Sequence, residues 1–145
     1  MRTLGIDFGT RRIGLALSDA GGKLATPREV LQITAIPQAI NEIAKVIETE
    51  GVERIVIGLP LNMDGTRGGS AKEVTEFARL LAQRSGVKVI FVDERLSTFQ
   101  AEQDLLDARR DGQKLTRKSK KLRLDAVAAA NFLQDFLDGK LEPLE

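Results

Sequence analysis

The alternation of hydrophobic and polar residues predicts a chain that begins with short β-strands and continues with helix–strand pairs. Two β-like runs, Thr3–Asp7 and Ile13–Ser18, are followed by a glycine-rich turn at 19–22 and a third run over Lys23–Leu31. Pro27 lies within that third run. Because proline cannot donate a backbone hydrogen bond to a ladder, we expect this strand toward an edge. The opening is therefore an antiparallel meander.

After the meander, helical and strand-like segments alternate. Apolar residues follow the helical period over Ile36–Glu50, and Gly51 ends that helix. Ser70-Ala-Lys-Glu73 has the spacing of a capping box and begins a second helix, which ends near Ser85-Gly86. Buried-type strands are predicted over 54–60 and 87–92. Their crossover connections make strands one, four and five parallel, so the fold class is α/β, a five-stranded mixed sheet with helices on both faces.

The last third of the chain is predicted to be mainly helical. Ser97 or Thr98 caps a helix that runs to about Arg110, a polar loop covers 111–119, and a final helix covers roughly Lys120–Leu137. No internal repeat or long linker divides the sequence. We therefore predict one domain over 1–138 and a short tail over 139–145.

The amino-acid composition excludes several kinds of catalytic and metal site. The 145 residues include no cysteine and no histidine, which excludes disulfides, thiolate zinc sites and Ser-His or Cys-His catalysis. The lack of disulfides fits a reducing cytoplasm. No signal peptide is evident, and no run approaches the roughly 18 apolar residues of a membrane span. We expect a cytoplasmic protein without a membrane partner.

Acidic residues lie at the ends of two strands that should open on the same edge of the sheet. Asp7 ends the first strand, where it could cap a turn or belong to a functional site. Asp93 and Glu94 end the fifth strand. Because neighbouring strand residues point to opposite faces, one of the two can face the site while the other is solvated or pairs with Arg95.

Asp125 is the most informative acid, because it lies on an apolar helix face. That face is formed by Leu122, Ala128, Ala129, Phe132 and Phe136. A carboxylate there needs a partner, which could be an arginine such as Arg95 or Arg123, or a cation in a functional site. Carboxylates from distant parts of the chain, in a protein without softer ligands, suit one or two Mg²⁺ or Mn²⁺ ions.

Basic residues gather just before Asp125. Between Gly112 and Leu124 there are six basic residues and no acidic one: Lys114, Arg117, Lys118, Lys120, Lys121 and Arg123. Arg11, Arg12, Arg67 and Arg95 could add contacts from the opposite rim. Such runs are often ordinary surface charge, but beside a metal site this one would hold a polyanion, structured RNA or branched DNA. The lack of Trp and Tyr favours backbone recognition over base stacking.

Four segments of the sequence resemble the signature blocks of the bacterial YqgF/RuvX family. They are Leu4-Gly-Ile-Asp-Phe-Gly-Thr-Arg-Arg-Ile-Gly14, Ile57-Gly-Leu-Pro-Leu-Asn-Met-Asp-Gly65, Val92-Asp-Glu-Arg-Leu-Ser-Thr98 and Leu124-Asp-Ala-Val-Ala-Ala-Ala130. The resemblance implies a ribonuclease H-like fold and a nuclease that processes the 5′ end of precursor 16S rRNA. It also implies that Asp7, Glu94 and Asp125 are metal-binding catalytic acids.

Other functions stay open at this stage. The same family has been assigned as Holliday-junction resolvases, which would favour a homodimer over a monomer. Two departures from the related RuvC-type resolvases bear on that assignment: Gly58-Leu59-Pro60 stands where they take a fourth-strand glutamate, and Leu122 where they carry a second helical acid. The segment 5–10 also looks like the first phosphate loop of actin and sugar-kinase ATPases, which need two such domains. A non-catalytic nucleic-acid-binding module is the remaining alternative.

Overall fold

A computed structural model describes residues 1–9, 11–96 and 117–144, and over 117–124 it describes the backbone alone. Its centre is a five-stranded sheet in the order β3-β2-β1-β4-β5. The strands are β1 (Thr3–Phe8), β2 (Arg12–Ser18), β3 (Ala25–Gln32), β4 (Arg54–Leu59) and β5 (Lys88–Asp93). β1, β4 and β5 are parallel, and β2 and β3 run antiparallel to them. The predicted mixed sheet is confirmed, as is the edge position of the Pro27 strand.

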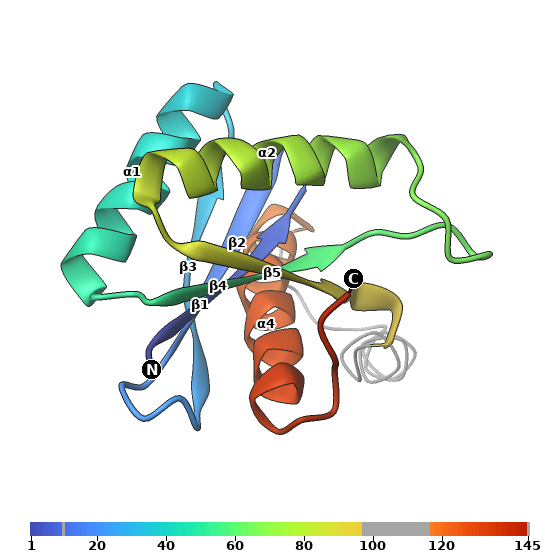
Figure 1. The fold of residues 1–145 in the computed structure, drawn as a ribbon. Coiled ribbons are helices and arrows are strands. Elements are labelled where there is room, and N and C mark those ends of the chain that lie inside the picture. The colour runs from blue at the N-terminus through green and yellow to red at the C-terminus, as the bar shows by residue number, and fades with distance from the viewer. Residues whose placement is uncertain (10, 97–116, 145) are drawn as a thin grey trace.

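Helices cover both faces of this sheet (Figure 1). α1 (Ile36–Glu50) and α2 (Gly69–Ser85) lie on one face, and α4 (Arg117–Leu137) lies on the other. Each face has its own apolar core, the larger between the sheet and α1 and α2, the smaller beneath α4. A short 3-10 turn, η1 (Glu94–Leu96), follows β5 directly. The strand ends that carry the predicted acids therefore lie between helices of opposite layers.

The amphipathic pattern accounts for these layers. The buried positions of α1 recur at helical spacing, at Ala39, Ile40, Ile43, Ala44, Val46 and Ile47. Its last turn ends at Gly51, whose left-handed φ of 67° suits a residue without Cβ. On α4, Ala129, Phe132 and Leu133 are fully or almost fully buried against the sheet. Burying one such large side chain contributes about 1.5–3 kcal/mol, which fixes the face that each helix presents.

Several details differ from the predictions, among them the bounds of the third strand, which are Ala25–Gln32 and not Lys23–Leu31. The capping box at Ser70 is wrong: the N-cap of α2 is Gly68, two residues earlier, and no side chain forms a cap hydrogen bond there. The last helix begins at Arg117 rather than near Lys120. The C-terminal segment does not trail away, since Leu141 is buried and the Leu144 amide donates to the Phe91 carbonyl at 2.8 Å. The helix predicted over 97–110 and the loop over 111–116 lie outside the described residues.

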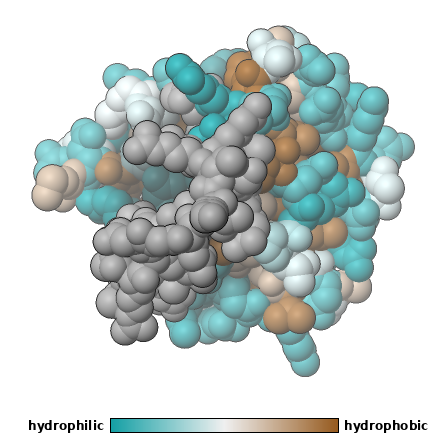
Figure 2. Space-filling view, turned by 180° about the vertical axis from the view of Figure 1, so that it is seen from behind, coloured by the Kyte–Doolittle hydropathy of each residue, from teal (hydrophilic) through white to brown (hydrophobic). Residues whose placement is uncertain are grey.

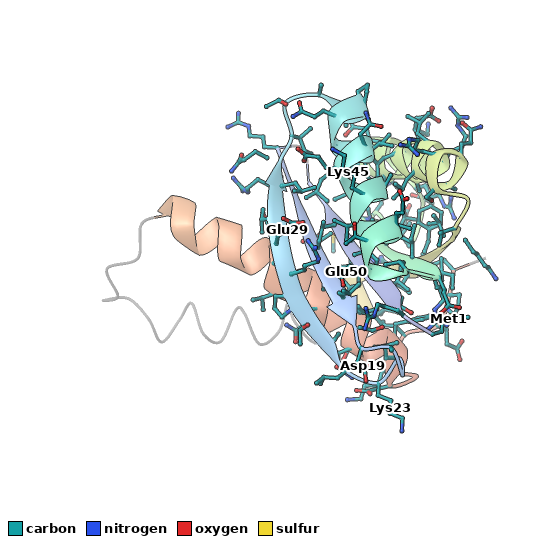
Figure 3. The ribbon with its side chains drawn as sticks, turned by 90° about the vertical axis from the view of Figure 1, so that its left-hand side faces the viewer. Met1, Asp19, Lys23, Glu29, Lys45 and Glu50 are labelled. Atoms are coloured by element: carbon teal, nitrogen blue, oxygen red, sulfur yellow. The ribbon has the colours of Figure 1, made fainter. Side chains whose placement is uncertain are left out.

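The end of the sheet opposite to the acids is closed by the β2–β3 hairpin. Asp19 Oδ1 accepts hydrogen bonds from the Lys23 and Leu24 amides, and the Met1 ammonium donates to the Ala20 carbonyl. Figure 3 shows Met1, Asp19 and Lys23 near one another at this end. Seen from behind, hydrophobic side chains reach the surface in patches separated by hydrophilic ones (Figure 2). Among the described residues, no helix has the length and apolarity needed to cross a lipid bilayer.

Candidate active site

A pocket of about 160 Å³ opens where β1, β4 and β5 end. Asp7 and Glu94 are among its lining residues. The other lining residues come from the strand ends and from the first turns of α2: Phe8, Gly9, Pro60, Ser70, Glu73 and Val74. This is the edge at which α/β sheets place their ligands, because the loops leaving parallel strands diverge there. Two of the three predicted acids therefore face one pocket.

A glycine on β2 brings the third acid to the same edge. Gly14 lies opposite Asp7 in the β1–β2 ladder. A Cβ added at Gly14 would lie 2.1 Å from the backbone carbonyl oxygen of Asp125, which is far inside van der Waals contact. Helix α4 can therefore cross β2 this closely only over a residue without a side chain. The crossing point sets Asp125 beside the strand end that carries Asp7.

A second glycine makes room for Glu94. A Cβ added at Gly58 on β4 would lie 3.2 Å from both Cβ and Oε2 of Glu94, and 3.3 Å from the ring of Phe132. The Glu94 side chain thus lies against β4, although its own backbone belongs to the turn after β5. Sequence reasoning missed the roles of Gly14 and Gly58. Their signal is a glycine within a buried strand, which often marks the close approach of another segment.

The three acids share one electrostatic environment. The pKa of Asp7 is raised from 3.8 to about 7, first because the carboxylate is buried and then because Glu94 and Asp125 are negatively charged. Burial also raises the pKa of Glu94, with a further contribution from the charge of Asp93. A cation bound among these groups would offset the repulsion and the desolvation that hold a proton on Asp7.

The residues at this edge fit a hard divalent cation by their chemistry. Their potential ligand atoms are carboxylate oxygens, which Mg²⁺ and Mn²⁺ prefer as ligands. Within the described part of the chain, no three acidic side chains are already gathered as metal ligands. Asp125 instead accepts a hydrogen bond from Arg12, with 2.8 Å between Arg12 Nε and Asp125 Oδ2. The partner expected for a buried Asp125 was Arg95 or Arg123, and the structure supplies Arg12.

Comparison with known proteins identifies the family of this chain. A family profile described as "RuvX: Holliday junction resolvase" matches residues 1–139. The chain belongs to the RuvX family. Relatives named "Putative pre-16S rRNA nuclease" include one from Syntrophomonas wolfei, 42% identical over 139 residues covering 96% of this chain and 95% of the relative. Another, from an Anaeromyxobacter species, is 43% identical over 140 residues, covering 97% and 98%. The predicted family resemblance is confirmed.

Solved structures similar to this RuvX family member confirm the ribonuclease H-like fold. Thermus thermophilus RuvC in complex with a Holliday junction substrate has a TM-score of 0.61 at 17% identity, covering 99% of this chain and 100% of that one. The fowlpox virus resolvase in complex with substrate Holliday junction DNA has a TM-score of 0.54 at 13% identity, covering 96% and 98%. At these identities the similarity concerns the fold alone.

The structure also bears on the difference from the RuvC-type resolvases at β4, where this RuvX family member has Gly58 and no acid. Gly58 on β4 leaves space, and the carboxylate of Glu94 lies beside that space. An acid from the end of β5 thus takes a position next to the one that a β4 side chain would have. A carboxylate therefore lies beside β4, although β4 itself carries no acid.

Asp93, the other acid of the pair, has a structural role in this RuvX chain. Its side chain is buried, and its carboxylate accepts hydrogen bonds from the Arg95 guanidinium at 2.7–3.2 Å. Arg95 lowers the pKa of Asp93 through these bonds. Arg95 Nη1 also donates to the carbonyls of Asn62 and Met63, at 2.6 and 3.2 Å. The Asp93–Arg95 pair therefore links the loop after β4 to the end of β5. Pairing with Arg95 was one of the two possibilities predicted for the acid that does not face the site.

The basic residues predicted to contact nucleic acid lie in different environments, and only some of them are exposed. Arg11 and Arg67 are exposed, Arg12 pairs with Asp125, and Arg95 pairs with Asp93. Lys114 lies outside the described residues. Five basic residues, Arg117, Lys118, Lys120, Lys121 and Arg123, belong to the first turns of α4, where the backbone alone is described. These turns lead along the same helix to Asp125.

Proposed function

We propose that this chain is a metal-dependent endonuclease that acts on structured RNA and processes the 5′ end of precursor 16S rRNA. The observation that carries the proposal is the convergence of Asp7, Glu94 and Asp125 at one strand edge, with a pKa of about 7 at Asp7 caused by burial and by the other two acids. Hydrolysis of a phosphodiester bond is the activity expected of such carboxylates with a divalent cation. The names of the relatives support the rRNA precursor as substrate.

The oxygens of Asp7, Glu94 and Asp125 would hold one or two Mg²⁺ or Mn²⁺ ions. When bound, the ion supplies the positive charge that activates water and stabilises the leaving oxygen of the phosphodiester. The chain's own contribution is to keep the three acids at one strand edge, with Asp7 and Glu94 lining a partly buried pocket, where their charges act strongly. Asp7, which keeps its proton up to a pKa of about 7 without a cation, would release that proton to solvent when the cation binds. We expect cleavage to leave 5′-phosphate and 3′-hydroxyl ends.

The basic residues would hold the substrate by its phosphates. Arg11 and Arg67 are exposed, and the basic turns at the start of α4 lead to Asp125. Such contacts position a nucleic acid without reading its sequence, so recognition rests on shape and backbone. We propose that the chain acts as one domain over 1–138, against which the short C-terminal segment packs, in the cytoplasm and as a monomer or homodimer.

Resolution of four-way DNA junctions is the second candidate. It is favoured by the description of the family profile and by the RuvC-like fold. The two candidates share the acids and the cation and differ in substrate. A direct comparison of substrates therefore separates them, whereas a metal requirement alone does not.

The test is a cleavage assay with Mg²⁺ or Mn²⁺ on 5′-extended precursor 16S rRNA and on a four-way DNA junction. We expect cleavage of the RNA that stops with excess chelator and falls by about 10²-fold or more in Asp7→Asn, Glu94→Gln and Asp125→Asn. Glu76→Gln is the matched control, because Glu76 forms an exposed pair with Arg79 on α2.

Three results would contradict the proposal. Cleavage of the junction alone would favour the resolvase. RNA binding with cleavage unchanged in Asp7→Asn would favour a non-catalytic module, with a contaminating nuclease as the source of the cleavage. Full cleavage in excess chelator would exclude the metal scheme.

A further inference from the structure

The ion pair between Arg12 and Asp125 joins two residues that the proposed function uses for different purposes. Arg12 begins β2, Asp125 lies on α4, and 2.8 Å separate Arg12 Nε from Asp125 Oδ2. Both side chains are about one-quarter exposed, at 26% and 28%. The pair is therefore neither a surface contact exchanging freely with water nor a sealed core contact. The Arg12 guanidinium binds one oxygen of the Asp125 carboxylate. A cation in the proposed site would bind the same carboxylate.

Two positive charges cannot share this carboxylate without cost. A divalent ion at Asp125 would lie within a few ångströms of the Arg12 guanidinium, where like charges repel strongly in a partly buried site. An arginine also has a good alternative partner, because its planar fork matches a phosphate as well as a carboxylate. The substrate proposed above would bring such a phosphate to the same edge.

We propose that Arg12 is an exchangeable counter-ion of Asp125, which pairs with Asp125 before the substrate arrives and moves to a substrate phosphate when a divalent cation binds Asp125. This inference rests on the proposed function and assigns Arg12 a positioning role in it. Asp125 therefore has a positively charged partner at every stage, first Arg12 and then the cation. The substrate phosphate has Arg12 as its partner after the exchange. The exchange also makes metal binding and RNA binding mutually favourable, because each removes a competitor of the other.

Arg11 provides a matched control. It is adjacent in sequence, carries the same charge and is exposed, and among the described ion pairs it takes part in none. Removing either arginine changes the net charge near the site by the same amount. A difference between Arg12→Gln and Arg11→Gln therefore reports the contact with Asp125 and not the overall field.

The experiment is a titration of the full chain with Mn²⁺ at pH 8 without RNA, with free Mn²⁺ measured by electron paramagnetic resonance. We expect Arg12→Gln to tighten Mn²⁺ binding by about three- to tenfold, Arg11→Gln to change it by less than about twofold, and Asp125→Asn to weaken it. Arg12→Lys, which keeps the charge, should stay within about twofold of the unmodified chain. Circular dichroism verifies that each variant is folded.

A second measurement tests the exchange itself. RNA affinity is compared with and without Mn²⁺ in the chain that keeps all three acids, within a time over which gel electrophoresis shows the RNA intact, and separately with Arg12→Gln or Arg11→Gln added. The ratio of the two affinities should fall at least about threefold with Arg12→Gln. Arg11→Gln should weaken RNA binding equally with and without Mn²⁺, so that its ratio stays unchanged. Equal effects of the two glutamine variants, or weaker Mn²⁺ binding in Arg12→Gln, would overturn the inference. Neither readout needs cleavage, so an inactive protein would count against the proposed function and not against this exchange.

Discussion

Glu94 lies directly against Gly58, so that a methyl group on Gly58 would come within 3.2 Å of the Glu94 carboxylate oxygen Oε2. The glycine belongs to β4 and the acid to the turn that follows β5. Leu59 pairs with Asp93 in the ladder between these strands, which places the start of the turn beside the end of β4. The position of a proposed catalytic acid therefore depends on the lack of a side chain on the neighbouring strand.

Gly58→Ala should reduce cleavage more than stability. The added methyl must move Glu94 or Phe132 by a few tenths of an ångström, and acids misplaced by such distances lose much of their effect. We expect about a tenfold fall in kcat with a loss of at most about 1–3 kcal/mol in the free energy of unfolding. Urea denaturation and single-turnover cleavage measure the two. Gly21→Ala, in the hairpin far from the site, is the control, and full activity of Gly58→Ala would contradict the geometry.

Gly14→Ala should be the more damaging substitution. Its methyl would overlap the Asp125 carbonyl oxygen, at 2.1 Å, and the neighbouring backbone atoms, so α4 would have to move as a whole. We expect a loss of more than about 3 kcal/mol in the free energy of unfolding, at the severe end of overpacking effects. Urea denaturation measures it, with Gly21→Ala again as the control. A loss below 1 kcal/mol would mean that α4 does not cross β2 at this glycine.

The raised pKa of Asp7 predicts how stability depends on pH without metal. In the unfolded chain Asp7 ionises near 3.8, whereas in the folded protein it keeps its proton to about 7. The folded state therefore binds more protons between these values, so stability falls as pH rises from about 4 to about 7 and stays low above that. The loss is at most about 4 kcal/mol. The pKa of Glu94, also raised, contributes with the same sign.

Urea denaturation in chelator at several pH values checks this dependence. Asp7→Asn should flatten most of the slope and should be more stable than the unmodified chain at pH 8. Asp138→Asn, which changes an exposed acid, should keep the slope. An unaltered slope in Asp7→Asn would show that another group titrates.

Asp93→Asn should loosen the loop that follows β4. The variant weakens the hydrogen bonds that hold Arg95, and Arg95 in turn holds the carbonyls of Asn62 and Met63. We expect trypsin to cut after Arg67 at least about fivefold faster, because cleavage requires local opening of the loop. Glu76→Gln, in an exposed pair, should leave the rate unchanged. An unchanged rate in Asp93→Asn would mean that the loop is held by its own turn alone.

The sequence by itself predicted the described strands and helices, their order, and Asp7 and Asp125 as acids of the proposed site. Helical and strand periods are local properties, so α1 was predicted with its observed bounds, and Pro27 identified an edge strand. Crossover connections require parallel strands, which brings Asp7 and Glu94 to one edge. Asp125 was informative because an acid on an apolar helix face needs a partner, whatever that partner is.

Only the tertiary structure decided which groups meet. Arg12 and Asp125 are 113 positions apart, and their pairing depends on where α4 crosses the sheet, which Gly14 allows. The sequence pattern also left open which of Asp93 and Glu94 faces the site, because alternation gives two opposite directions but not which face is filled. Packing decides this: Gly58 leaves space for Glu94, and Arg95 takes Asp93. Such contacts join distant segments through side-chain volume, and local periodicity carries no information about volume elsewhere in the fold.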